Sequence, residues 1–178
     1  MTIYLKHPSR QDGEDWPLPP TRDAIASWEA GTATLPADYI HFMMSYNGGS
    51  VYPMHFDIGI DEEIADIWDV PDQSLVAMFF DWAKFVKTNA YIGPERKHML
   101  QIGVDTDSSF LGLSPDGQVV HIWRNFPGAW DEEDDGPMPV TVLAPDFRSF
   151  LRILDDRDGV APRWNLPQDL EAARIITF

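Results

Sequence analysis

Residues 35–49 read Leu-Pro-Ala-Asp-Tyr-Ile-His-Phe-Met-Met-Ser-Tyr-Asn-Gly-Gly, and this stretch decides the fold. Pro36 suits the first turn of a helix, where its missing N–H group costs nothing. Apolar residues then recur at helical spacing on one face: Tyr39, Phe42, Met43 and Tyr46. Asn47, Gly48 and Gly49 tolerate the left-handed backbone that ends a helix. The sequence therefore predicts a short helix with both ends marked.

The flanking sequence predicts further helices. Thr21 is suited to cap a helix that runs to Glu29. Residues 50–60 carry β-type side chains, and an acidic helix is expected over residues 60–68. From Ser74 to Asn89 the apolar spacing fits one longer helix, but Asp81 could instead cap a separate second half. Both interpretations of that segment remain open.

The second half of the chain predicts a sheet. Three extended segments are expected, at about 98–104, 109–114 and 118–124. Ser114 to Gly117 read Ser-Pro-Asp-Gly, a turn signal that makes a hairpin of the last two segments. Pro139 to Leu143 fit an edge strand, and Asp146 begins a helix. This order predicts an α+β fold with a mainly antiparallel mixed sheet and helices packed around it.

Length and composition indicate one packed domain over residues 1–178, with 44% hydrophobic residues. Residues 1–20 are expected to be an exposed lead-in, and residues 155–178 a charged C-terminal extension with a short helix near 167–174. The chain has no Cys, which excludes disulfides, a thiol nucleophile and thiolate metal sites. Since no secretory signal pattern and no membrane-length apolar run occurs, we expect a cytoplasmic protein.

The formal charge of −16 is unevenly placed along the chain. The interval from Arg22 to Lys84 contains eleven acidic residues and no further base, and that from Arg124 to Arg148 contains six. Such a field repels nucleic acid and anionic membranes and attracts basic partners. An acidic surface also keeps a protein soluble, so the charge taken alone leaves both interpretations open.

The patterns that would indicate an enzyme or a metal site fail in detail. Residues 112–117 resemble a nucleophile elbow, but the second Gly comes one residue late and the stretch predicts a hairpin turn. Residues 105–109 begin like a calcium loop, but Phe110 and Asp116 stand where Gly and Glu are needed. We expect a polar turn there, and we expect no catalytic residue, metal or cofactor.

Two histidines occupy positions that invite a functional interpretation. His55 and Asp57 alternate on one expected strand, so the pair could orient an imidazole or hold a metal, although a strand His is more often structural. His121 flanks Trp123 on one face of the expected hairpin, where either packing or contact with a partner would suit it.

Two acidic segments are the candidate partner-binding surfaces. The first is Trp130 followed by five acidic residues, Asp131, Glu132, Glu133, Asp134 and Asp135. The second is the expected acidic helix with Asp61, Glu62, Glu63 and Asp66. An exposed Trp can anchor an interface, and flanking carboxylates can steer a basic partner. For both segments an ordinary solvated surface remains the alternative.

The stretch over residues 35–49 resembles the signature of the SMI1/KNR4 (SUKH) superfamily. In that signature a Leu-Pro pair, an acidic-aromatic pair and a terminal Asn-Gly-Gly bracket a helix, and the order of later segments over residues 20–155 is similar too. The resemblance implies a SUKH-like domain that binds proteins and is not an enzyme. For many bacterial members it implies an immunity protein that neutralises a cognate toxin. The charge favours a basic, nuclease-like toxin, and the alternative is a regulatory or scaffolding module without a toxin partner.

Overall fold

In the computed structural model, the described residues are 2–6, 17–59, 73–90, 99–106, 109–123, 140–156 and 173–177. They form four helices and nine strands, and the strands pair antiparallel, so the predicted α+β fold is confirmed. The elements are β1 (Ile3–Lys6), α1 (Arg22–Glu29), α2 (Ala37–Tyr46), β2 (Ser50–Tyr52), β3 (His55–Asp57), β4 (Gln73–Phe79), α4 (Trp82–Thr88), β5 (Leu100–Asp105), β6 (Phe110–Leu113), β7 (Val119–Ile122), β8 (Val140–Ala144), α5 (Phe147–Ile153) and β9 (Arg174–Ile176).

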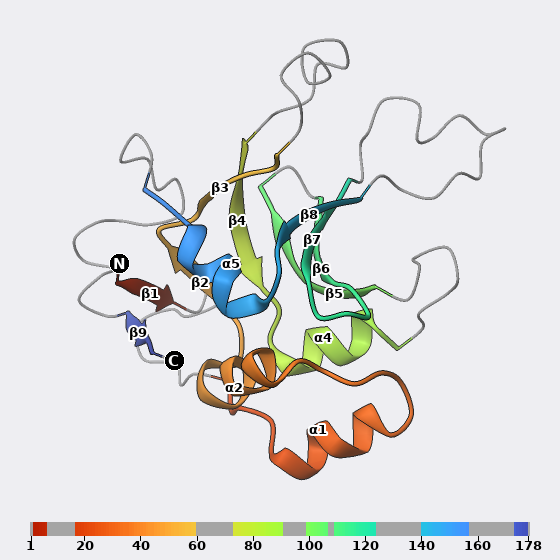
Figure 1. Cartoon of the computed structure of the whole chain (residues 1–178). Helices are drawn as coiled ribbons and strands as arrows, with labels where there is room; N and C mark the ends of the chain where they lie inside the picture. The colour runs from red at the N-terminus through yellow and green to blue at the C-terminus, as the bar shows by residue number, and fades with distance from the viewer. Residues whose placement is uncertain are drawn as a thin grey trace, which may run out of the picture.

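The larger sheet has six strands in the order β3-β4-β5-β6-β7-β8 and curls into a nearly closed, barrel-like shape (Figure 1). Its edge strands are β3 and β8, so the prediction of an edge strand near Pro139 is confirmed. After β8 the chain forms α5, and Asp155 then exchanges two backbone hydrogen bonds with His55 of β3, at 3.0 and 3.1 Å. The chain thus passes from one edge strand to the other.

The helix predicted from the opening stretch is confirmed as α2. Asn47 ends it with φ of 54°, in the left-handed region. The predicted apolar face is buried, and the Phe42 ring lies 5.5 Å from the Phe79 ring and 4.9 Å from the Phe147 ring, measured between centroids. This aromatic contact joins α2, β4 and α5 in the core. The helix capped by Thr21 and the hairpin at Ser114 to Gly117 are confirmed as well.

The interpretation of residues Ser74 to Asn89 as one helix is wrong. Gln73–Phe79 is the strand β4, and Asp81 caps the separate helix α4 by accepting a 2.8 Å hydrogen bond from the Lys84 N–H. The sequence of β4 suggested a helix because this strand lies between two others and is apolar on both faces, so polar and apolar residues do not alternate along it. A short apolar run of this kind fits a helix or a buried strand equally well.

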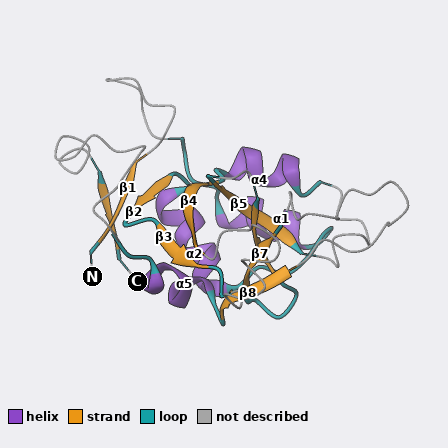
Figure 2. Cartoon of the chain, turned by 90° about the horizontal axis from the view of Figure 1, so that it is seen from above, coloured by secondary structure: helices purple, strands orange, loops and turns teal. Residues whose placement is uncertain are grey.

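A second sheet, in the order β2-β1-β9, was not predicted. Ile3 and Leu5 are buried in it, so residues 3–6 are not an exposed lead-in, and Ile176 near the C-terminus is buried as well. Figure 1 places β1 beside β9, although the two strands come from opposite ends of the chain, and Figure 2 shows β1 beside β2. Pairing between such distant segments leaves no local signal.

Two predicted helices lie wholly or largely outside the described residues. The acidic helix expected over residues 60–68 lies outside the described residues. Of residues 167–174, only Ala173 and Arg174 are described, and Arg174 belongs to β9.

Candidate protein-binding end of the sheet

The six-stranded sheet has two different ends, which the pairing register defines. Asp57 pairs with Gln73, Val76 with Asp105, Phe110 with Ile122, and Ile122 with Val140. The last residues of β3, β5 and β7 therefore lie at the same end as the first residues of β4, β6 and β8. We name this the acidic end, formed by Asp57, Gln73, Asp105, Phe110, Ile122 and Val140.

Both candidate acidic segments leave and rejoin the sheet at the acidic end. Residues 58–72 connect β3 to β4 and include six acidic residues, and residues 124–139 connect β7 to β8 and include five. All ten candidate partner-binding residues belong to these two connections and lie outside the described residues: Asp61, Glu62, Glu63, Asp66, Trp130, Asp131, Glu132, Glu133, Asp134 and Asp135. The register brings together the attachment points of two segments that looked unrelated in sequence.

The negative charge belongs mostly to segments outside the described framework. The described residues include ten acids and seven bases, a net charge of −3 out of the −16 of the whole chain. The framework alone is thus nearly balanced, and the surplus of carboxylates belongs to the remaining segments. Two of those segments are attached at the acidic end.

A buried polar cluster lies within the sheet at the acidic end. Its centre is Asp105, whose Oδ2 accepts a 2.9 Å hydrogen bond from Ser74 Oγ and another 2.9 Å bond from His121 Nε2–H. Oδ1 accepts a 2.8 Å bond from the N–H of Ser109. These four side chains are all at most 5% exposed. The cluster ties β4, β5 and β7 together where the acidic connections begin, and the Asp105–Ser109 bond confirms the predicted polar turn.

Hydrogen bonds keep the Asp105 carboxyl ionised in this apolar setting. Burial by itself raises the pKa of Asp105, but bonds from His121, Ser74 and the Ser109 N–H outweigh it and leave the pKa below its ordinary value. Although Ser, His and Asp occur together, they do not form a catalytic triad, because the Ser and the His both bond to the same carboxylate oxygen. The arrangement holds strands together and offers no nucleophile to solvent.

Sequence reasoning missed the contact between Asp105 and His121. A signal was present in β7, where Val-Val-His-Ile places one polar residue in an otherwise apolar, fully buried strand. Such a residue needs a buried partner, but the sequence does not say which strand supplies it. The His121 ring also packs at right angles against the Trp123 ring, with centroids 4.7 Å apart, which favours packing over partner contact for that pair.

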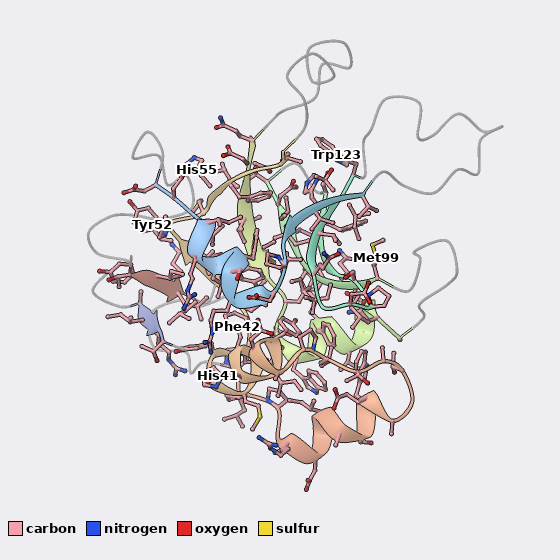
Figure 3. All side chains as sticks on the ribbon, viewed as in Figure 1. His41, Phe42, Tyr52, His55, Met99 and Trp123 are labelled. Carbon is pink, nitrogen blue, oxygen red and sulfur yellow. The ribbon has the colours of Figure 1, made fainter. Side chains whose placement is uncertain are left out.

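The pair of His55 and Asp57 does not form a metal site with its described neighbours. His55 is half-buried and Asp57 is exposed. Figure 3 shows His55 on the edge strand β3. Within the described ranges, no group of three or more His, Cys, Asp or Glu side chains could hold a metal ion. The His55 backbone pairs with Asp155 on one side and lies opposite Leu75 of β4 on the other.

The opposite end of the sheet is covered by α1, α2 and α4, and we name it the helical end (Figure 1). The Asn47 side chain connects three segments there. Its Nδ2 donates to the carbonyls of Pro17 and Leu18, at 3.3 and 2.9 Å, and its Oδ1 accepts a 2.7 Å bond from the Trp82 N–H. A Cβ on Gly48 would lie 2.5 Å from the Phe80 carbonyl. The Asn-Gly-Gly triplet is therefore a structural joint.

The chain is therefore an α+β protein in which an Asn-Gly-Gly joint organises the helical end of the sheet. The chain belongs to the SMI1 / KNR4 family (SUKH-1), whose model matches residues 19–153. β1 and β9 lie outside the matched residues. No curated protein and no solved structure matches the chain. Among the helices described, none has the length and apolar character to cross a membrane.

Proposed function

We propose that this protein is an immunity protein that neutralises a cognate bacterial toxin by direct, non-catalytic binding. Membership of the SMI1 / KNR4 family supports a protein-binding role. The observation that carries the proposal is the attachment of both acidic connections at one end of the sheet. Since attachment at one end lets their carboxylates act on the same partner, we assign the partner-binding surface to the acidic end.

The partner we propose is a basic toxin domain, and a nuclease fits best. A groove that binds nucleic acid presents Lys and Arg side chains to phosphates. Carboxylates from residues 61–66 and 131–135 would occupy that groove in place of phosphates and block it. Trp130 would supply an apolar anchor beside them. The buried cluster around Asp105 joins β4, β5 and β7 at the end of the sheet where both connections are attached.

Affinity capture tests the proposal. The full chain is used as bait for the native cell lysate and secreted fraction at low and high salt, and bound proteins are identified by mass spectrometry. We expect one basic domain that is toxic when expressed alone and harmless when expressed with this protein. A partner without toxicity would overturn the immunity role and favour a regulatory or scaffolding module.

Matched charge variants then test the assigned surface. E132Q/E133Q removes two charges from the connection that is attached at the acidic end, and D23N/D116N removes two exposed charges from the helical end. We expect the first variant to slow association with the captured domain about tenfold at low salt, and the second to change it less than about twofold. Equal effects of the two variants would contradict the assignment.

A further inference from the structure

The strand β8 is an edge whose outer side pairs with no described residue. Among the described strands it pairs only with β7, whereas the other edge, β3, receives the backbone of Asp155. Natural edge strands are commonly protected by a charged residue that discourages further pairing. The β8 sequence, Val-Thr-Val-Leu-Ala, contains no charged residue. Its middle residue, Val142, is 54% exposed.

Apolar side chains are aligned across the sheet as far as this edge. Residues that face each other across neighbouring strands form one row from β4 to β8: Met78, Val104, Phe110, Ile122 and Val140. Val120 and Val142 form part of a second row beside it. The register irregularity between β7 and β8 falls at Val119, so Val140 to Val142 keep regular pairing. A strand added to β8 would extend both rows with its own apolar side chains.

We propose that the outer edge of β8 binds an extended, basic segment of the partner as an added strand. This inference rests on the proposed function and names the part of the partner that the acidic end recognises. Backbone hydrogen bonds to the edge supply affinity, and side chains at alternate positions supply specificity. The acidic run Asp131 to Asp135 precedes β8 by only a few residues, so its negative charge attracts Lys and Arg side chains of the added strand.

This mode of binding predicts the sequence pattern of the partner segment. Apolar residues at every second position pack beside Val140 and Val142, and basic residues occupy the positions between them. An acidic segment of the same apolar pattern is repelled, because five acidic residues come shortly before β8 in the sequence. A helical partner surface does not satisfy the edge, since its backbone groups are already bonded within the helix.

A peptide titration tests the inference without the native partner. The probe is a capped seven-residue peptide of alternating Lys and Val, and the control probe has Glu in place of Lys. Amide NMR shifts of the full chain are followed at low and high salt. We expect the largest shifts at residues 140–144 with the Lys-Val peptide, weaker binding at high salt, and no binding of the Glu-Val peptide.

Variants assign the binding to the edge. Val142→Pro removes a backbone donor and should lower the affinity for the Lys-Val peptide at least tenfold. If that variant does not fold, Val142→Ala should lower the affinity for the peptide several-fold. The matched control is Ile175→Ala, since Ile175 is also 54% exposed and also lies on an edge strand. Absent binding, shifts centred elsewhere, or equal loss in the two Ala variants would overturn the inference. The proposed function would then still stand or fall by the capture experiment.

Discussion

The helical end and the acidic end of the sheet differ in how they relate to the sequence. At the helical end, Asn47 bonds to the 17–18 segment and to α4, and Gly48 lies against the Phe80 backbone. At the acidic end, buried bonds around Asp105 hold the strands, and the connections that leave them carry the charge. The residues of the Asn-Gly-Gly joint therefore belong to the scaffold, while the segments proposed to select a partner are attached at the opposite end.

The largest effect is expected at the helical end. Gly48→Ala places a methyl group 2.5 Å from the Phe80 carbonyl at a φ of 79°. We expect the free energy of unfolding to fall by about 3–5 kcal/mol, from left-handed strain together with overpacking. The matched control is Gly59→Ala, with a φ of 73° and no atom of the described residues within 4 Å of the new methyl group. Strain alone should cost it about 1 kcal/mol in denaturant unfolding. Equal losses would mean that Gly48 matters only for its backbone angles.

At the acidic end, Asp105→Asn should be the most damaging single change. One amide oxygen replaces two carboxylate oxygens that accept three hydrogen bonds, and the new NH₂ group faces donors. We expect a loss of about 2–4 kcal/mol in denaturant unfolding and shifted amide resonances at Ser74 and Ser109. Asp116→Asn, in the exposed hairpin turn, should stay within about 0.5 kcal/mol. A loss below about 1 kcal/mol for Asp105→Asn would show that the cluster does not hold this end.

The same carboxyl predicts a pH dependence. The pKa of Asp105 in the folded protein lies below its ordinary value of 3.8, so its ionised form stabilises the fold above about pH 4. That contribution is lost as the pH falls through the lower, folded value. We expect the free energy of unfolding to decline on acidification below about pH 4, and Asp105→Asn to flatten part of that decline. An unchanged slope in the variant would contradict the role given to Asp105.

A smaller effect separates stability from binding. Thr21 Oγ1 accepts a 3.2 Å hydrogen bond from the Ala24 N–H and caps α1. Thr21→Ala should lower stability by about 1 kcal/mol, and Thr34→Ala, at another exposed Thr near the same end, should lower it by less. Neither change should alter the affinity for the captured partner when both proteins are folded. A binding defect in Thr21→Ala would place the partner at the helical end.

Sequence reasoning succeeded where the determining interactions are local. The caps at Thr21 and Asp146, the left-handed Asn47 and the Ser114 to Gly117 turn all depend on residues a few positions apart. The cap at Asp81 is one of two alternatives that the sequence leaves open. It failed for β4, which its two neighbouring strands determine, and for the sheet of β1, β2 and β9, whose strands come from distant parts of the chain. The meeting of two acidic connections at one end follows from strand register, which composition does not encode.

Hydrogen exchange on the complex with the captured partner tests the central claim most directly. The amides of the full chain are compared with and without that partner at low salt. We expect protection to increase at the start of β4, at the end of β7 and along β8, and to stay unchanged in α1 and α4. Protection confined to α1, α2 and α4, with the acidic end unchanged, would contradict this claim.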